Sequence, residues 1–334
     1  MNILYTLNDK FVPQVGAGIC SVCENNKDVN EITFYIVSYG ITDKNKKELE
    51  KLVKKYKRKI EIIELNNINS YFDFDFDTTG WNPIVLARLL VDKLLPSNLD
   101  KVLYLDGDTI VRTNLEELYN CNMNRKIIGM SIEPTIDKGR IKNLKMGKKP
   151  YCNAGVLLID LKAWRNKKAG NRIINYYKNN NGRLFANDQD AINGSMKDEI
   201  KIISPKYNYY NIFDQYSYRF LSKIMRPIDY SYYVSEKKFK EARNNPSIIH
   251  YLGEERPWRK GNTHKYKSDY KKYLNMTVWK DAKDEEGWTL YFICWKIFNV
   301  VTKPFPMLRL SIINSLIPKF MNIRSKKVKK EIKK

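Results

Sequence analysis

Short apolar segments alternate with amphipathic ones through the first third of the chain, and no other feature constrains the fold as strongly. Four segments are brief, apolar and rich in β-branched or aromatic side chains, which is typical of buried strands: 3–5, 32–37, 60–65 and 101–105. The stretches between them place apolar residues at helical spacing: 12–22, 42–56 and 84–95. This alternation predicts an α/β fold whose parallel sheet is covered by helices on both faces.

The sharpest chemical signal directly follows the last of these predicted strands. Asp106, Gly107 and Asp108 come at its carboxyl end, where sheets of this kind bind their ligands. Residues two apart project to the same side of an extended chain, so the two carboxylates converge, while Gly107 allows other atoms close to the backbone. Mg²⁺ and Mn²⁺ prefer such oxygen ligands and share them with substrate phosphates. The segment therefore predicts a divalent metal site, with an ordinary polar turn as the alternative.

Two other acidic clusters have a similar spacing. Residues 73–77 alternate Asp with Phe, which indicates an exposed loop with its aromatic side chains turned inward. Asp188, Gln189 and Asp190 form the second cluster, where Asp188 could simply cap the helix that follows. The later chain is less regular, with a strand predicted at 156–159 and one helix at 161–179.

Histidine is scarce, and one of the two histidines stands in a suggestive context. His250 follows the apolar pair Ile248 and Ile249, so its imidazole at a strand end could be a third metal ligand. A histidine of this kind is often only a satisfied polar group. Here Gly253 and Arg256 follow, and a glycine with a guanidinium suits a cradle for phosphate.

The charge balance narrows the partners. Lys and Arg number 60 against 37 Asp and Glu, a net charge of +23, which suits nucleic acid, anionic lipid or a phosphorylated small molecule. The five cysteines form no regular framework, which indicates a reducing compartment. Cys20 and Cys23 have redox or zinc spacing, but two small residues on one helix face explain them as well. With no signal peptide and no apolar run of membrane-spanning length, we expect a cytoplasmic protein.

The chain changes character near its end. Residues 288–301 place aromatic side chains on one predicted helical face, a second apolar stretch follows, and the last residues are rich in lysine. This pattern suits the surface of an anionic membrane, whereas a helix packed on the catalytic body plus a solvated charge run is the alternative. We therefore divide the chain into a catalytic domain, 1–280, and a membrane-association segment, 281–334, which would hold the protein to the inner face of the membrane.

Four segments together resemble family 8 of the retaining glycosyltransferases, which includes bacterial lipopolysaccharide galactosyl- and glucosyltransferases. The similarity runs from residue 3 to about residue 258. Its motifs follow one another in the family order: 4–9 (LYTLND), 101–108 (KVLYLDGD), 151–161 (YCNAGVLLIDL) with 188–190 (DQD), and 250–258 (HYLGEERPW). Each motif is modest by itself, and the ordered set is specific.

The resemblance implies a GT-A fold, a UDP-hexose donor with galactose or glucose, a glycan or lipid-linked saccharide acceptor, and Mn²⁺ or Mg²⁺. It implies metal ligation by Asp106, Asp108 and His250. It implies donor contacts from Thr6, Asn8, Asp9, Arg88, Asp106, Gly107, Asn153, Ala154, Gly155, Asp188, Gly253 and Arg256. Asp188 would hold sugar hydroxyls, and Gln189 would lie near the reacting carbon. The chain departs from many members at Asn8 and Lys10, which bear on nucleotide preference, and at Arg256, where lysine is usual.

The amide of Gln189 is a poor nucleophile. The hypothesis for retention of the anomeric configuration is therefore that the acceptor hydroxyl attacks the anomeric carbon from the face that the diphosphate leaves. Three other classes of protein are alternatives. A nucleotidyltransferase would explain the paired carboxylates but not the 153–155 segment or His250. A nucleic-acid-binding protein would explain the charge, but no nucleic-acid motif accompanies it, so no nucleic-acid partner is expected. An inactive or glycogenin-like member of the same fold is the third.

Overall fold

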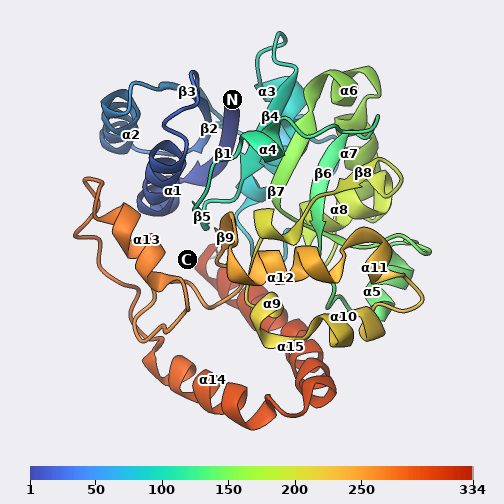
Figure 1. Ribbon diagram of the computed structural model, residues 1–334. Helices are drawn as coiled ribbons and strands as arrows, with labels where there is room; N and C mark the ends of the chain where they lie inside the picture. Colours follow the sequence, from blue (N-terminus) through green and yellow to red (C-terminus); the bar gives the residue numbers. More distant parts are fainter. Residues whose placement is uncertain (333–334) are drawn as a thin grey trace.

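The computed structural model of the protein describes residues 1–332, so the last two residues of the predicted membrane-association segment lie outside it. A seven-stranded sheet forms the centre, in the order β3-β2-β1-β4-β7-β6-β8 (Figure 1). Its strands are β1 (Asn2–Asn8), β2 (Thr33–Tyr39), β3 (Lys59–Glu64), β4 (Lys101–Leu105), β6 (Ile128–Ile132), β7 (Cys152–Asp160) and β8 (Ile200–Ile202). Every strand predicted from the apolar runs is present.

Strand direction follows the prediction in the first half of the chain and departs from it afterwards. β3, β2, β1 and β4 run parallel as neighbours in the sheet. Helical crossovers join these strands in chain order, from β1 to β2, β2 to β3 and β3 to β4. β7 runs antiparallel to both β4 and β6, so the sheet is mixed. Because β7 is buried along almost its whole length, its apolar run is the same as that of a buried parallel strand, and the pattern could not reveal its direction.

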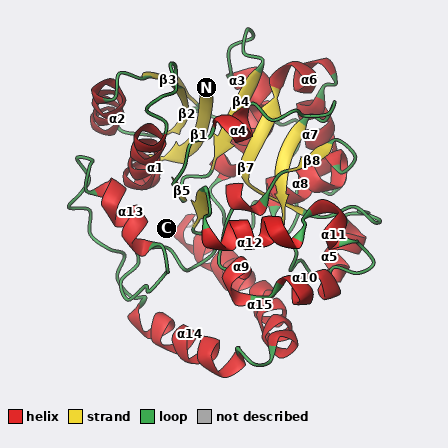
Figure 2. Cartoon of the chain, viewed as in Figure 1, coloured by secondary structure: helices red, strands yellow, loops and turns green. Residues whose placement is uncertain are grey.

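Helices surround the sheet (Figure 2). The crossovers contain α1 (Val12–Asn25), α2 (Asp43–Lys55), the 3₁₀ helix Pro83–Leu90 and α3 (Val91–Leu94). Thr42 accepts a hydrogen bond from the Asn45 backbone N–H and so caps α2, which buries Leu49, Leu52 and Val53. The predicted helix at 84–95 is thus mostly 3₁₀. The predicted helix at 161–179 is divided at Lys168, whose φ of 50° ends α6 (Leu161–Asn166) before α7 (Ala169–Asn179).

A second, two-stranded sheet lies at the end of β4 and positions the site. β5 (Thr109–Val111) follows the Asp106–Asp108 turn and pairs antiparallel with β9 (Ile248–His250). The register places His250 opposite Thr109. A histidine far along the chain is therefore held beside the carboxylates that end β4.

The remaining elements are short helices around this core. They are α4 (Glu116–Tyr119), α5 (Lys138–Asn143), α8 (Asn187–Met196), α9 (Ile212–Gln215), α10 (Tyr218–Ile224), α11 (Tyr230–Tyr233), α12 (Glu236–Asn244) and α13 (Lys267–Leu274), with 3₁₀ turns at Asp9–Phe11, Ile68–Tyr71 and Pro205–Tyr207. Residues 73–77 form the expected loop, in which Asp73 and Asp75 are exposed. Cys20 and Cys23 are both free and buried in α1, as the helix-face interpretation expects.

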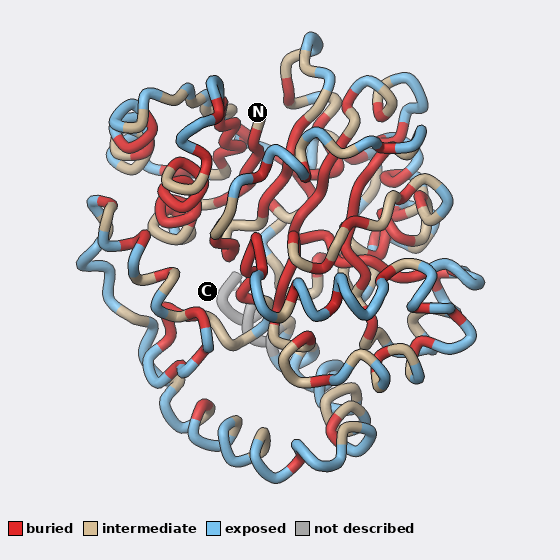
Figure 3. The backbone as a smooth tube through the Cα atoms, in the orientation of Figure 1, coloured by how far each residue is buried: buried red, intermediate tan, exposed pale blue. Residues whose placement is uncertain are grey.

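Two C-terminal helices follow: α14 (Thr289–Thr302) lies at the bottom of Figure 1, and α15 (Pro306–Ile332) runs from there back up toward the C mark. Most of α14 is exposed (Figure 3). Its aromatic side faces the protein, since Phe292 is buried and the Arg309 guanidinium of α15 lies over the Trp295 and Phe298 rings. Within the described part of the chain, no helix has both the length and the apolar character needed to cross a membrane.

Candidate metal and donor site

Three potential metal ligands converge where β4 ends. Asp106, Asp108 and His250 each offer a ligand atom, and these atoms lie within 4.8 Å of one another. The His250 Nε2 lies 3.3 Å from an Asp108 oxygen and 3.8 Å from an Asp106 oxygen. Burial lowers the pKa of His250, but the carboxylates of Asp108, Asp106 and Glu133 together raise it by more, so the pKa lies above its ordinary value. The cluster is a negatively charged pocket that also holds one imidazole.

The His250 ring is fixed from behind by an amide. Its Nδ1 lies 2.9 Å from the Asn208 Oδ1, so Nδ1 is the donor to that amide and Nε2 is the nitrogen that faces the carboxylates. Gly155 provides the room for the ring, because a Cβ at that position would lie 2.2 Å from the His250 Cε1. Both features suit an imidazole that serves as a ligand through Nε2.

Arg88 joins the two acidic motifs. It is 6% exposed, and its Nη2 lies 2.8 Å from an Asp106 oxygen while its Nε lies 3.1 Å from an Asp188 oxygen. Its guanidinium also lies over the Tyr104 ring and donates to the Ala154 carbonyl at 2.8 Å. Asp188 therefore acts as an ion-pair partner inside α8, not as the cap of that helix.

The environment of Asp188 favours its neutral form more than usual. Burial raises the pKa of this carboxyl to about 6, although the Arg88 guanidinium acts in the opposite direction. Asp190 is engaged in a separate cluster, where Arg140 and Tyr151 both donate to its Oδ1 at 2.6 Å. Neither carboxylate of the 188–190 motif is thus a free side chain.

Gln189 is held in one orientation by three hydrogen bonds. Its Oε1 accepts from the Ala154 backbone N–H at 2.9 Å, and its Nε2 lies 3.0 Å from both a Glu133 oxygen and the Tyr151 hydroxyl. Glu133 also accepts from Asn153 at 2.9 Å. The 153–155 segment of β7 therefore forms one wall with Gln189, beside the carboxylates that end β4.

A network of amides connects this wall to the histidine. The Asn153 Oδ1 accepts from the Asn208 Nδ2 at 2.9 Å and from the Gly155 backbone N–H at 2.9 Å. Asn208 in turn holds His250. One continuous hydrogen-bonded chain thus runs from Glu133 through Asn153 and Asn208 to the imidazole.

The guanidinium of Arg256 lies beside the carboxylates of the cluster. The Arg256 Nη2 is 3.6 Å from an Asp108 oxygen, and its guanidinium lies over the rings of Phe11 and Trp258. Its buried Nε has no hydrogen-bond partner. Gly253, with a φ of 80°, lets the loop turn before Arg256. A donor without an acceptor next to paired carboxylates suits a bound phosphate oxygen.

The end of β1 forms the opposite rim. Thr6 is buried with its hydroxyl 3.2 Å from that of Tyr104, and the Asn8 Oδ1 is buried without a partner. One oxygen of Asp9 already accepts from Thr42 and Asn45 of the next crossover. Gly107 packs closely against the residues that follow β1, because a Cβ at Gly107 would lie 3.2 Å from Val15 and 3.3 Å from Phe11.

The donor set fits a hard divalent cation. Two carboxylates and one imidazole, whose Nδ1 is hydrogen-bonded to Asn208, form a usual ligand set for such an ion. The Arg256 Nε remains available for a phosphate. Tyr104 and Tyr151 also contribute to the site, although the sequence analysis gave them no role within their motifs. Glu133 and Asn208 contribute as well and lie in no quoted motif. Asn208 gave no signal because no metal or catalytic motif includes it.

Comparison with known proteins identifies the relatives of this arrangement. The family model described as Glycosyl transferase family 8 matches residues 2–262. General stress protein A of Bacillus subtilis is 25% identical over 285 residues, which cover 84% of this chain and 94% of that protein. Lipopolysaccharide 1,2-glucosyltransferase of Escherichia coli is 24% identical over 86% of this chain and 81% of its own. The fold matches that of the galactosyltransferase LgtC, solved with donor and acceptor sugar analogues, with a TM-score of 0.69 and 22% identity over 86% of this chain and 99% of LgtC.

Proposed function

The chain belongs to glycosyl transferase family 8, and from this premise we propose that it moves galactose or glucose from UDP to a hydroxyl of a glycan or lipid-linked saccharide, with retention of configuration at the anomeric carbon. One observation carries the proposal. The ligand atoms of Asp106, Asp108 and His250 converge within 4.8 Å, next to a guanidinium whose Nε lacks a partner. That combination suits a diphosphate bound together with a metal ion.

Each residue of the donor site would have its own role in binding the metal ion, the diphosphate or the sugar. Asp106, Asp108 and His250 would hold Mn²⁺ or Mg²⁺, which supplies positive charge for the departing diphosphate. Arg256 would donate hydrogen bonds to the same phosphate group and keep its charge beside Asp108. Arg88 would hold Asp106 and Asp188 at a fixed separation, and Asp188 would accept hydrogen bonds from sugar hydroxyls.

The contacts of Gln189 bear on how configuration would be retained. A double displacement needs a free carboxylate beneath the anomeric carbon. Asp188 and Asp190 are both paired with arginines, and the Gln189 amide is fixed by Ala154, Glu133 and Tyr151. These contacts support attack by the acceptor hydroxyl on the face that the diphosphate leaves, with the departing phosphate taking the proton. A sugar adduct isolated on Asp188, Asp190 or Glu133 would contradict this order of events.

Release of UDP from a panel of UDP-sugars, without acceptor, tests the proposed reaction. We expect one hexose donor to give UDP in the presence of Mn²⁺ and none in the presence of EDTA. If no UDP-sugar is cleaved, calorimetry with UDP separates two causes. Binding of UDP would mean that transfer needs the acceptor, whereas absence of binding would show that Asn8 and Lys10 select another nucleotide and would refute the UDP assignment.

We further propose that α14 and α15 hold the protein at the inner face of an anionic membrane. The aromatic side of α14 is turned inward, so the surface for lipid is its aliphatic side, which consists of Leu290, Ile293, Ile297, Val300 and Val301, each more than half exposed. Lys296 and Lys303 are exposed on the same helix and its end, and no ion pair with either is found among the described residues. Apolar side chains next to unpaired cations suit a surface of anionic headgroups.

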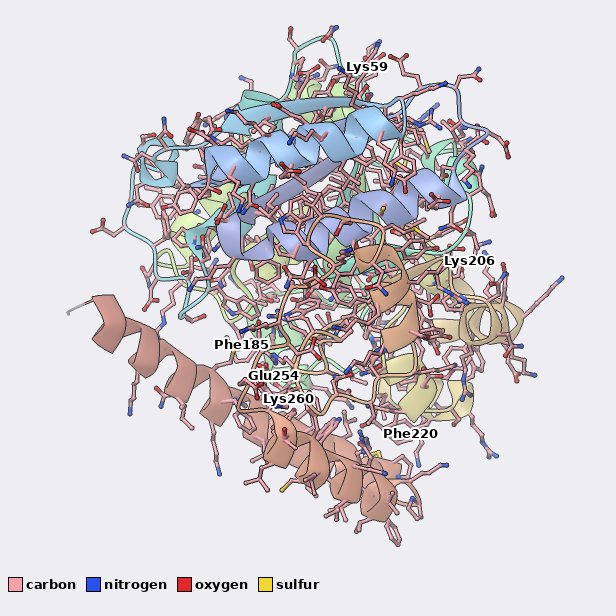
Figure 4. All side chains as sticks on the ribbon, turned by 90° about the vertical axis from the view of Figure 1, so that its left-hand side faces the viewer. Lys59, Phe185, Lys206, Phe220, Glu254 and Lys260 are labelled. Atoms are coloured by element: carbon pink, nitrogen blue, oxygen red, sulfur yellow. The ribbon has the colours of Figure 1, made fainter. Side chains whose placement is uncertain are left out.

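The membrane proposal is tested with point variants, because the C-terminal segment also holds the loop of Arg256. Glu285 accepts from Arg259 at 3.0 Å, and the Arg259 guanidinium lies over the Trp288 ring. Glu254 and Lys260 of that loop lie next to the C-terminal helices, whereas Lys59 lies at the far end of the molecule (Figure 4).

Replacing Ile293, Ile297 and Val300 together by Ser should release the full chain from vesicles that contain anionic phospholipid. Lys59→Glu should leave vesicle binding unchanged, although it also removes a positive charge. Equal binding of both variants and the wild type in a flotation assay would refute the membrane role of α14.

A further inference from the structure

A second cavity adjoins the reaction centre on the side of α5. Its volume is about 370 Å³, which is within the roughly 300–1,000 Å³ of small-molecule sites. Glu133 and Tyr151 line it, and these are two of the three groups that hold the Gln189 amide. The cavity therefore begins one side chain away from the amide that is proposed to lie near the reacting carbon.

Cations outnumber carboxylates around this cavity by four to one. Lys138, Lys142, Lys145 and Arg226 all line it, and Glu133 is the one carboxylate among the lining residues. Each of the four cations is exposed, and none forms an ion pair within the described residues. Elsewhere on this basic protein many lysines do have carboxylate partners, as Lys206 has with Glu117 and Glu241.

The three lysines lie on α5 or just after it. Lys138 and Lys142 are four apart on α5, so they share one helix face, where like charges destabilise the helix. Lys145 follows the helix with a φ of 53°, a backbone conformation that residues other than glycine and asparagine rarely adopt. An anion bound among the lysines would offset the repulsion that this arrangement creates.

The floor of the cavity is apolar. Ile141 of α5 and Ile224, Met225 and Ile228 of the α10 region line it below the cations. Sugar rings have apolar faces and polar edges, so an apolar floor with cations at the rim suits a saccharide that carries a negative group.

We propose that this cavity binds the acceptor saccharide through an anionic substituent, a phosphate or a carboxylate, held by Lys142, Arg226 and their neighbours. The proposal rests on the proposed sugar transfer and names the chemical class of its acceptor. The Glu133 end of the cavity would then receive the ring that carries the attacking hydroxyl, and the lysine end would receive the charged group.

Binding of small saccharide probes tests the proposal directly. The full chain is titrated with glucose, glucose 6-phosphate and glucuronic acid, with diamagnetic Mg²⁺ and excess UDP present so that the donor site is occupied. Binding is followed by ligand-observed NMR. We expect at least one anionic probe to bind roughly tenfold or more tightly than glucose, given the strength of charge-assisted hydrogen bonds. The phosphate and carboxylate arms show which anion the cavity prefers.

Two variants localise the binding. Lys142→Glu combined with Arg226→Glu should weaken binding of the anionic probe about tenfold or more, and an unchanged thermal unfolding midpoint would show that the variant is folded. Lys47→Glu, an exposed position on α2 far from α5 in Figure 1, is the matched control and should bind as the wild type does.

Equal binding of glucose and the anionic probes, no binding of either anion, or equal loss in the Lys47→Glu control would overturn the proposal. The acceptor-free release of UDP by the wild type is measured separately. That release tests the sugar transfer itself, so failure of the acceptor site and failure of the proposed function give different results.

Discussion

Gly155→Ala is the sharpest test of the histidine as a metal ligand. The new Cβ would lie 2.2 Å from Cε1 and 2.5 Å from Nδ1 of the His250 ring. Ordinary van der Waals contact begins near 3.5 Å, so the ring must move by about 1 Å or more. It would thereby lose the 2.9 Å hydrogen bond to Asn208 and its place beside Asp108.

The loss of affinity follows from that displacement. Removing groups that orient a metal ligand typically reduces metal affinity 10–100-fold, or about 1.4–2.7 kcal/mol. We expect Mn²⁺ affinity in the presence of UDP to fall by this amount, with UDP release falling in parallel at limiting Mn²⁺. UDP release should recover in part at high Mn²⁺ concentration, because the two carboxylates remain and a higher metal concentration offsets the weaker binding.

Gly129→Ala is the matched control. Calorimetric titration with Mn²⁺ in the presence of UDP measures the metal affinity of both variants and of the wild type. Gly129 lies on the neighbouring strand β6, where a Cβ would lie 3.1 Å from Ile203 and 3.3 Å from Leu158, and neither is a candidate metal ligand. This variant adds the same methyl group to the sheet and should bind Mn²⁺ as the wild type does. Wild-type Mn²⁺ affinity in a folded Gly155→Ala protein would refute the role of His250.

Three further variants extend the account. Asp106→Asn should abolish UDP release while the protein stays folded, and normal turnover would remove Asp106 from the metal site. Arg88→Met should lower the free energy of unfolding in urea by about 3 kcal/mol, because it leaves Asp188 buried without its cation; a loss below about 1 kcal/mol would contradict this. Burial lowers the pKa of His264 to about 4, so the unfolded state takes up the proton first below pH 6.5. The His264 contribution to stability should fall by up to roughly 3 kcal/mol between pH 6.5 and 4. It is measured as the difference in unfolding free energy between the wild type and His264→Asn, because Asp188, with its raised pKa, changes stability in the opposite direction over the same range; a difference that does not change with pH would rule out His264.

The sequence predicted the sheet and the position of the site because both follow from local patterns. Apolar runs of strand length located β1, β2, β3 and β4, and the acidic turn after β4 marked the edge where ligands bind. It also selected His250, which the pairing of β5 with β9 brings to those carboxylates. Position alone left His250 either a metal ligand or a satisfied polar group, and the family resemblance supplied the three-residue ligand set.

Other features depend on tertiary contacts that no local pattern records. The direction of β7 is one, since a strand buried on both faces has the same composition in either direction. Asn208 is another, because it matters only through its bonds to His250 and Asn153. Apolar residues lie all round α14, so the sequence could not show that the aromatic side faces the protein and the aliphatic side remains exposed.

The most direct test of the central claim is the configuration of the sugar that the enzyme first releases. In the presence of diamagnetic Mg²⁺ and without acceptor, water takes the acceptor's place, and NMR follows the anomer formed from a UDP-hexose with an α linkage. We predict that α-hexose appears first, that EDTA prevents its release, and that a His250→Ala variant releases it much more slowly. Initial release of β-hexose, or equal release in EDTA, would contradict a retaining, metal-dependent transfer at this site.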